Sequence, residues 1–493
     1  MPQSNSNRPD NYNALLLQLE DILSAEYLLT KKEELTPYEC DGLSAYQRLP
    51  LAVALPDTIE QVQKIVKLCA NLQIPIVARG AGTGLSGGAL PHEGGIILGL
   101  SRFNKIIEVD VKKQSATVQP GVRNLAISEA ANPHGLFYAP DPSSQIACSI
   151  GGNVAENAGG VHCLKYGLTV HNVLQVKIVT IDGDLVTLGS QTLDTPGYDL
   201  LALITGSEGM LGIIVEVVVK LLPRPDSVKV LMAAFDKVED AGNSVAKIIA
   251  SGIIPAGLEM MDKPAIQAAE AFAKANYPLD AAAILLCELD GTEQQVNEQI
   301  EIIERTLKEA NASDIVVAKS MEEQARLWAG RKSAFPAVGR LSPDYYCMDG
   351  TIPRKRIAYV LQKIEELSQQ HQLRVANVFH AGDGNLHPLI LYDANNEGEL
   401  ETAERFGADI LELCVAVGGS ITGEHGVGHE KIDQMCVQFN EAELTQFFAV
   451  KSAFDPDALL NPGKAIPTLH RCAELGAMHV HNGELPHPEI PRF

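Results

Sequence analysis

Two histidines lie at the two ends of one short, glycine-containing turn. They are His380 and His387, and the turn separates the apolar runs 375–379 and 388–391. A single histidine at the end of a strand is usually a structural residue. Two histidines at the mouth of one hairpin converge, which is the geometry that a bound metal ion requires. The spacing therefore points to a metal site at this turn.

A third ligand is available in the glycine-rich segment GGSITGEHGVGH at 418–429. Its Glu424 and His425 are neighbours, and neighbouring side chains of an extended backbone point to opposite faces. One side chain could then face a metal ion while the other faces a substrate. Two imidazoles and one carboxylate leave coordination positions open, as a catalytic site requires, and they suit Zn, Mn, Fe or Co. The alternative is a glycine-rich turn with incidental polar residues.

The segment RGAGTGLSGG at 79–88 contains the G-x-G-x-x-G pattern of a dinucleotide-binding turn. That pattern works only where the last glycine opens a helix, and residues 86–95 hold too much glycine and proline to start one. The sequence therefore predicts a long loop. Such a loop is either a flexible connection or a chain of exposed backbone N–H groups that binds an anion. Arg79 and the hydroxyls of Thr83 and Ser86 favour phosphate binding.

A second segment of small residues, PDPSSQIACSIGGNVAENAGG at 140–160, is the other candidate for an anion site. Its content of glycine and short polar side chains predicts that it supplies no core element. Neither segment by itself identifies the phosphate-bearing ligand.

Hydrophobic periodicity and turn chemistry predict the elements that must position these segments. In the first half we expect strands at 51–55, 74–78, 95–100, 106–111 and 116–118, and helices at 59–72 and 122–132. The Asp182-Gly183 turn predicts a hairpin over 173–188, followed by a helix, a turn and a strand that ends at Pro223. From residue 227 the alternation of strands and helices indicates a ferredoxin-like antiparallel sheet with helices on one face. We expect the chain to finish with helices at 321–337, 399–417 and 441–454 and one more hairpin.

Composition limits the class of protein. The chain has 493 residues, enough for two or three domains, and its formal net charge of −23 disfavours nucleic acid and anionic membrane surfaces as partners. The N-terminal residues indicate neither a signal peptide nor a transmembrane segment, so we expect a cytoplasmic protein. None of the nine cysteines forms a Cys-x-x-Cys pair, which argues against an iron–sulfur cluster in this chain.

The order of the motifs supports a family resemblance over nearly the whole chain. RGAGTGLSGG, PDPSSQIACSIGGNVAENAGG, LITGSEGMLGIIVEV, HAGDGNLH, GEHG and LNPGK follow one another. This order resembles the FAD-linked 2-hydroxy acid dehydrogenases of the vanillyl-alcohol oxidase and p-cresol methylhydroxylase superfamily. The resemblance implies an α+β fold with a two-subdomain FAD-binding domain, a ferredoxin-like substrate (cap) domain and C-terminal helices. The expected divisions are an N-terminal helical segment 1–46, FAD-binding domain 47–226, cap domain 227–410, a segment 411–467 that returns to the FAD domain, and a tail 468–493.

By this resemblance the loop at 79–88 holds the FAD pyrophosphate and the segment at 140–160 forms a second wall around the flavin. Some relatives attach the flavin covalently to a histidine of the first loop, where this chain has Gly82 and Thr83, so we expect noncovalent FAD. The expected FAD-binding residues are Arg79, Gly80, Ala81, Gly82, Thr83, Gly84, Ser86, Gly87, Gly88, Pro140, Asp141, Ser143, Ser149, Gly151, Gly152, Asn153, Asn157, Gly159, Gly160, Glu208, Gly212, Ile213 and Asn461.

The resemblance also implies roles for the polar residues of the second half. His380, His387 and Glu424 would hold a divalent cation, and His425 would be the catalytic base. For the substrate carboxylate, Arg331 is the candidate contact because a guanidinium fork suits that group. The alternative is that Arg331 is a solvated helix arginine, in which case Lys332 is the candidate contact for the substrate carboxylate.

The implied activity is oxidation of a small 2-hydroxy acid, glycolate or D-lactate, with hydride transfer to the flavin. Relatives that oxidise D-2-hydroxyglutarate hold its second carboxylate with a lysine shortly before an Asp-x-x-x-Pro segment. The comparable stretch here, 345–353, has no cation between Tyr345 and Asp349, and Cys347 and Met348 would line that position. We therefore expect a monocarboxylate, with D-2-hydroxyglutarate as the alternative.

Electrons must leave the flavin for an acceptor other than NAD. The resemblance implies partner subunits, one of them an iron–sulfur protein, and through them a peripheral position at the inner face of a membrane. The competing interpretation is a noncatalytic, flavin-bearing relay subunit. A complete set of His380, His387, Glu424 and His425 favours the dehydrogenase, because a relay subunit would not need it.

Overall fold

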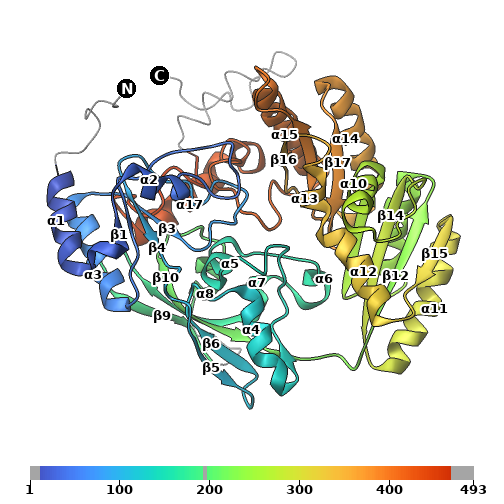
Figure 1. Ribbon diagram of the computed structural model, residues 1–493, viewed down its shortest axis with the longest axis horizontal. Coiled ribbons are helices and arrows are strands. Elements are labelled where there is room, and N and C mark those ends of the chain that lie inside the picture. The colour runs from blue at the N-terminus through green and yellow to red at the C-terminus, as the bar shows by residue number, and fades with distance from the viewer. Residues whose placement is uncertain (1–10, 192–196, 468–493) are drawn as a thin grey trace.

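The computed structural model describes residues 11–191 and 197–467, and the expected tail at 468–493 lies outside these residues. Figure 1 shows two lobes side by side. The first lobe runs from α1 (Tyr12–Ile22) to β11 (Leu222–Pro223), and the second from β12 (Ser227–Phe235) to α15 (Glu399–Ala416). The C-terminal residues, red in Figure 1, run back to the first lobe.

The first sheet confirms the predicted β-α-β unit. Its order is β1 (Leu28–Leu29), β2 (Ala52–Ala54), β4 (Ile96–Gly99) and β3 (Ile76–Arg79), with β2, β4 and β3 parallel. Helix α3 (Ile59–Leu72) has the predicted bounds, because the Thr58 hydroxyl accepts a hydrogen bond from the Gln61 N–H at its start. The strand β3 ends at the first glycine loop, which contains no helix, as the sequence predicted.

The second sheet is antiparallel. Its order is β5 (Ile106–Asp110), β6 (Ser115–Val118), β10 (Ile213–Lys220), β8 (Val173–Val179) and β9 (Leu185–Gly189). The predicted hairpin is β8 and β9, whose turn places Gly183 at φ +75°. The helices α4 (Asn124–Ala131) and α8 (Leu200–Ile204) contribute buried residues to the apolar core of this sheet.

The prediction that 140–160 contains no core element is wrong. Residues Ile150–Glu156 form helix α5, with Ser149 accepting a hydrogen bond from the Gly152 N–H. Ile150 and Val154 are buried in the core of the second sheet. Glycine weakens a helix locally, but close packing compensates here, because a Cβ at Gly151 would lie 2.6 Å from Pro120 Cβ.

The second lobe is built on a seven-stranded antiparallel sheet. The strand order is β15 (Asp314–Val317), β12, β14 (Ala283–Gly291), β13 (Gly257–Asp262), β17 (Val375–Phe379), β18 (Pro388–Tyr392) and β16 (Asp344–Cys347). The strands β17 and β18 are the predicted hairpin that follows α14 (Ile357–His371). The sheet is therefore longer than a four-stranded ferredoxin-like unit, because three further strands extend it beyond β13.

Helices cover both faces of this sheet, so the expectation of helices on one face is wrong. Side chains of β12 alternate between two apolar clusters, with Leu231 and Phe235 in one and Val230 and Met232 in the other. The first cluster includes residues of α9 (Val238–Ala250), α11 (Glu293–Glu309), α14 and α15. The second includes residues of α10 (Lys263–Ala273), α12 (Met321–Lys332) and α13 (Ala334–Val338). A strand that is apolar on both sides needs cover on both sides.

The C-terminal segment is packed onto the first sheet. Ile76 N–H donates to the carbonyl of Leu459 at 2.8 Å, and Asn461 N–H donates to the carbonyl of Ile76 at 2.8 Å. The preceding helix, α17 (Glu441–Phe454), has the predicted bounds. The remaining helices and strands are α2 (Lys32–Leu35), α6 (Cys163–Tyr166), α7 (Thr169–Asn172), α16 (Met435–Gln438) and β7 (Leu136–Phe137), with 3-10 turns at Ala25–Tyr27, Thr36–Tyr38, Asn132–His134 and Arg354–Arg356.

Candidate active site

A cavity of about 470 Å³ joins the first glycine loop to the histidines of the second half. Its walls come from the loop at 79–89, from α5 and the residues before it, and from the turn before β10. At its other end lie Lys332, Phe335, His387, Glu424 and His425. Fourteen of the expected FAD-binding residues line this cavity: Arg79, Gly80, Ala81, Gly82, Thr83, Gly84, Gly88, Ser143, Ser149, Gly151, Gly152, Asn153, Glu208 and Gly212.

Two glycines show why this wall needs residues without side chains. Gly82 has φ +69°, and a Cβ there would overlap the Arg79 guanidinium. A Cβ at Gly80 would overlap the Ser149 hydroxyl, so the first loop and the start of α5 approach each other closely. The Arg79 side chain is buried and donates from Nη1 to the carbonyl of Cys40 at 2.6 Å. The loop is therefore tied in place and presents backbone to the cavity.

The other expected FAD-binding residues, Ser86, Gly87, Pro140, Asp141, Asn157, Gly159, Gly160, Ile213 and Asn461, are not among the lining residues. Several of them support the walls from behind. Asn461 Nδ2 donates to the carbonyls of Gly88 and Glu208, and the Ser86 hydroxyl donates to the carbonyl of His425. Ile213 is part of the apolar core behind the first sheet.

The hairpin of β17 and β18 brings His380 and His387 together, as the spacing indicated. Their ring centroids are 5.1 Å apart and the rings are nearly perpendicular. Glu424 Oε1 lies 2.8 Å from His387 Nε2 and 3.3 Å from His380 Nε2. Although burial opposes ionisation, the two histidines hold the pKa of Glu424 well below its usual range.

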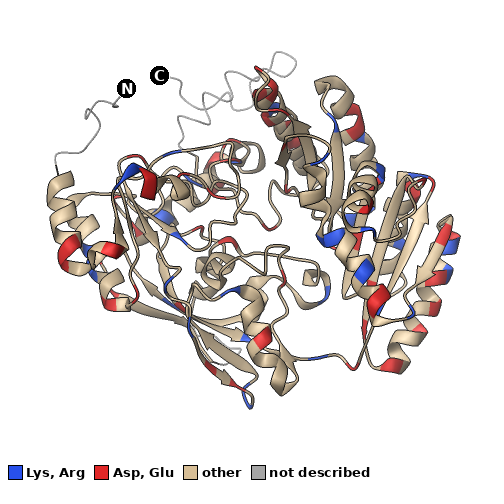
Figure 2. Ribbon diagram, in the orientation of Figure 1, with Lys and Arg blue, Asp and Glu red and all other residues tan. Residues whose placement is uncertain are grey.

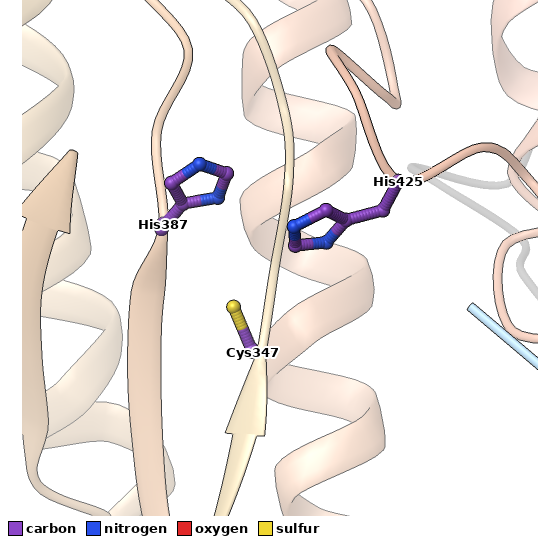
Figure 3. Close-up of side chains that lie close together, drawn as sticks. All are labelled: Cys347, His387 and His425. Carbon is purple, nitrogen blue, oxygen red and sulfur yellow. The ribbon is translucent and has the colours of Figure 1, made fainter. Parts of the chain in front are cut away.

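This donor set fits a divalent cation. His380 Nε2 is buried and has no hydrogen-bond partner among residues 11–191 and 197–467. Two groups of side chains have possible ligand atoms that all lie within 4.8 Å of one another, and both groups contain His387 and His425. One adds Asp349 and Glu424 and the other adds Cys347, and Figure 3 shows the second group. His380 belongs to neither group, although its Nε2 and that of His387 both lie close to Glu424 Oε1.

A buried chain of polar groups orients His380. Its Nδ1 lies 2.7 Å from Glu259 Oε1, and Glu259 Oε2 accepts from Arg331 Nε at 2.8 Å. All three residues are at most 3% exposed. Burial disfavours protonation of His380, but Glu259 and Glu424 outweigh it and hold its pKa well above its usual range.

Arg331 therefore occupies a different environment from the one expected of a substrate contact. Its guanidinium is bound to Glu259, and Arg331 is not among the residues that line the cavity, whereas Lys332 is. Arg331 is not the solvated helix arginine of the alternative, because it is 1% exposed. Of Arg331 and Lys332, only Lys332 lines the cavity.

His425 packs against His387, the second histidine of the hairpin. Its ring stacks on His387 at a centroid distance of 5.0 Å, and its Nε2 lies 3.9 Å from Glu424 Oε1. Burial lowers the pKa of His425 to about 4, against the opposing influence of Asp349. The imidazole is therefore neutral at neutral pH and can accept a proton.

The site contains acidic residues that the sequence argument did not single out. Glu259 is a carboxylate within the buried strand GLEMMD, and that local contrast was a signal that could have identified it. Asp349 follows β16 and accepts hydrogen bonds from the backbone of 423–425, a contact with no local signature. Glu156 lines the cavity beside Glu208, and burial, followed by Glu208, raises its pKa well above its usual range.

Comparison with known proteins decides the family. Residues 50–189 match the FAD binding domain, and residues 224–465 match the C-terminal domain of FAD linked oxidases. The glycolate oxidase subunit GlcD of Escherichia coli (strain K12) is 64% identical over 480 residues, which cover 97% of this chain and 96% of that protein. The chain belongs to the FAD-linked oxidases.

Other relatives of this FAD-linked oxidase include a second glycolate oxidase subunit and a D-lactate dehydrogenase. The glycolate oxidase subunit GlcD of Bacillus subtilis (strain 168) is 41% identical over 428 residues, covering 87% of this chain and 91% of that protein. A D-lactate dehydrogenase of Anaerostipes hadrus is 36% identical over 434 residues, covering 86% and 91%. FAD as the cofactor and an oxidoreductase as the class of enzyme are thereby confirmed.

Solved structures confirm the fold class. p-Cresol methylhydroxylase with substrate bound superimposes with a TM-score of 0.80 at 18% identity, covering 94% of this chain and 98% of that chain. The 4-ethylphenol oxidase from Gulosibacter chungangensis gives 0.78 at 18% identity, covering 94% and 99%. In the described parts of this FAD-linked oxidase, no helix has the length and apolar content that crossing a membrane would require.

Proposed function

We propose that this FAD-linked oxidase oxidises a small 2-hydroxy acid, glycolate or D-lactate, to the corresponding 2-oxo acid. The observation that carries the proposal is the position of His387, Glu424 and His425 in the lining of the same cavity as the first glycine loop. A candidate proton acceptor and two candidate metal ligands thus line the cavity to which the matched FAD binding domain contributes its walls. The names of the relatives, glycolate oxidase subunit and D-lactate dehydrogenase, supply the substrate class.

His380, His387 and Glu424 would hold the divalent cation, whose contribution is to bind the substrate hydroxyl and carboxylate and acidify the hydroxyl. Glu259 fixes the His380 ring so that Nε2 is the nitrogen available to the cation. The cavity leaves Lys332 at the same end for the substrate carboxylate, with Arg331 held behind on Glu259.

His425 takes the hydroxyl proton. Its imidazole is neutral because it is buried, and its Nε2 side faces Glu424 and His387. Bound FAD would supply the acceptor for the α-hydrogen, which leaves the substrate with its electron pair once His425 holds the hydroxyl proton. The His387 ring stacks on the His425 ring and would restrict its rotation.

The proposed preference for a short acid rests on residues 345–353. Residues 345–353 hold no cation between Tyr345 and Asp349, and Cys347 lies close to His387 and His425 (Figure 3), although it is not among the residues that line the cavity. A second carboxylate buried there without a partner would be disfavoured strongly. Between glycolate and D-lactate the difference is one methyl group, worth about 1 to 3 kcal/mol in such a pocket.

The electron acceptor is another molecule. The relatives named glycolate oxidase subunits are parts of a larger enzyme, so we propose partner subunits here too, one of them an iron–sulfur protein. Binding to such partners would place the chain at the inner face of a membrane.

Anaerobic mixing tests the proposal directly. Glycolate, D-lactate and D-2-hydroxyglutarate are added separately to the FAD-loaded protein, and bleaching of the flavin absorption is followed. We expect glycolate or D-lactate to bleach the flavin at least about 100-fold faster than D-2-hydroxyglutarate, the scale of an unpaired buried carboxylate. No bleaching by any 2-hydroxy acid would favour the relay subunit, and a preference for D-2-hydroxyglutarate would contradict the assignment of residues 345–353.

A further inference from the structure

The loop that carries Glu424 and His425 is held at its first end by one buried carboxylate. Asp349 Oδ2 accepts from the N–H of Gly423 at 3.1 Å and from the N–H of His425 at 2.9 Å. The N–H of Glu424 points at the same carboxylate, 3.2 Å from Oδ1 and 3.3 Å from Oδ2. Three successive backbone donors thus surround one side chain that is 0% exposed.

The other end of the loop is held by a second carboxylate. Glu208 Oε1 accepts from the N–H of Val427 at 2.7 Å, and Oε2 accepts from the N–H of Gly428 at 2.7 Å. Glu208 is 6% exposed and has φ +51°, a left-handed conformation that non-glycine residues seldom adopt. Both oxygens of Glu208 are therefore committed to the loop, although its side chain also lines the cavity.

The two carboxylates belong to different lobes. Asp349 follows β16 in the second lobe, and Glu208 precedes β10 in the first. Successive backbone N–H groups that curl around a carboxylate form an anion nest, and charge-assisted hydrogen bonds of this kind are roughly twice as strong as neutral ones. Lys431 supplies a buried counter-charge, because its Nζ lies 3.7 Å from Asp349 Oδ2 and donates to the carbonyl of Gly426 at 2.9 Å.

We propose that Asp349 and Glu208 act as a two-carboxylate clamp that sets the position of Glu424 and His425 relative to the FAD cavity. Both are positioning residues, because neither needs to touch the substrate. Glu208 is the sharper test, since each of its oxygens accepts one backbone N–H. In Glu208→Gln an amide NH2 must face one of those two N–H groups, and at least one bond to the loop is lost. The inference for catalysis rests on the proposed function, whereas the clamp itself does not.

Hydrogen–deuterium exchange on the FAD-loaded full chain tests the clamp without any substrate. In the wild type we expect slow exchange of the amides of 423–425 and 427–428. In Glu208→Gln the amides of Val427 and Gly428 should exchange about 10-fold faster or more, the scale of one lost hydrogen bond to a charged group. The amides of 423–425 should remain slow. Fast exchange of Val427 and Gly428 already in the wild type would overturn the clamp.

Flavin reduction tests the consequence for positioning. With glycolate or D-lactate at saturation, the flavin of Glu208→Gln should be reduced at least about 10-fold more slowly than that of the wild type. The KM should stay within about twofold, because a displaced base affects the transition state most. FAD content should stay at the wild-type level. Loss of FAD with unchanged amide exchange would make Glu208 a cofactor-binding residue, as the sequence indicated, and would overturn the clamp.

Asp262→Asn is the matched control. Asp262 Oδ1 accepts from the Ala265 N–H and Oδ2 from the Asn377 N–H, so the same chemical conflict is introduced away from the loop. This variant should leave loop exchange and flavin reduction within about twofold of the wild type. If Glu208→Gln fails to fold, Asp349→Asn is measured instead, with faster exchange expected at 423–425 and unchanged exchange there counting against the clamp. A wild type whose flavin no 2-hydroxy acid reduces would refute the proposed function, while the exchange data would still decide the clamp.

Discussion

Glu259 Oε1 lies 2.7 Å from His380 Nδ1, while the other oxygen of the same carboxylate is bound to Arg331. Because Nδ1 faces a carboxylate, Nε2 of His380 is the nitrogen directed at Glu424. A carboxylate behind a metal-binding imidazole fixes its ring and raises the basicity of its free nitrogen. Glu259 and His380 thus connect the buried Glu259–Arg331 ion pair of the second lobe with the candidate metal site.

Replacing Glu259 by Gln should weaken metal binding. Gln can still accept from His380 Nδ1, but it carries no charge, so we expect the affinity for a divalent cation to fall by about 10- to 100-fold. Titration of the apo-protein with Zn or Mn measures this. Glu216→Gln is the control, because Glu216 pairs with Lys177 at 2.8 Å in the second sheet of the first lobe. Equal affinities in both variants would contradict a role for Glu259 at the metal.

His380→Ala and Glu424→Ala should lose bound metal and turnover but keep FAD. The expected flavin walls are first-lobe residues that line the cavity. Glu424 lies at the far end of this cavity, and His380 lies behind Glu424. Elemental analysis beside the flavin absorption spectrum measures both quantities on the same sample. Normal metal content in both variants would refute the assigned ligands.

His425→Asn should keep both metal and FAD while flavin reduction slows by roughly 100-fold or more, the usual scale for a lost general base. Stopped-flow absorbance with saturating substrate gives the rate. His429, which follows in the same segment, is the comparison: His429→Asn should remain within about tenfold of the wild type. If the two effects were reversed, the base would be His429.

Cys347→Lys should shift the substrate preference. A lysine beside His387 and His425 would give a distal carboxylate a partner, so kcat/KM for D-2-hydroxyglutarate relative to glycolate should rise at least about tenfold. Met348→Leu conserves volume and adds no charge, and it should leave the ratio unchanged. An unchanged ratio in Cys347→Lys, with the protein folded and FAD bound, would place the distal end of the substrate elsewhere.

The flavin should be released by acid. Gly82 and Thr83 offer no nucleophile of the kind that attaches the cofactor in some relatives, so precipitation with acid should leave a colourless pellet and a yellow supernatant. Absorbance of both fractions at the flavin maximum decides this. A yellow pellet after washing would show a covalent bond.

Much of the site follows from short stretches of sequence. His380 and His387 meet because a hairpin necessarily brings the residues at the two ends of its turn together, and the bounds of α3 follow from Thr58 and a helical period. Residues 80–95 form no helix because of their glycines and Pro91, which are also local properties. Helix α5 and the second helical layer on the seven-stranded sheet were not foreseen, because packing against distant strands outweighed local propensity there.

The sequence alone therefore indicated the kind of chemistry: a glycine-rich wall for a phosphate-bearing ligand, which the family resemblance implied to be FAD, two histidines on one hairpin, and Glu424 beside His425. Only the tertiary structure decided which side chains fix these residues in place. Arg331 meets Glu259 across 72 residues, Asp349 meets the 423–425 backbone across 74 to 76, and Glu208 meets Val427 across 219. Such pairs leave no period or spacing in the sequence, because their partners are selected by burial and by the folding of two lobes around one loop.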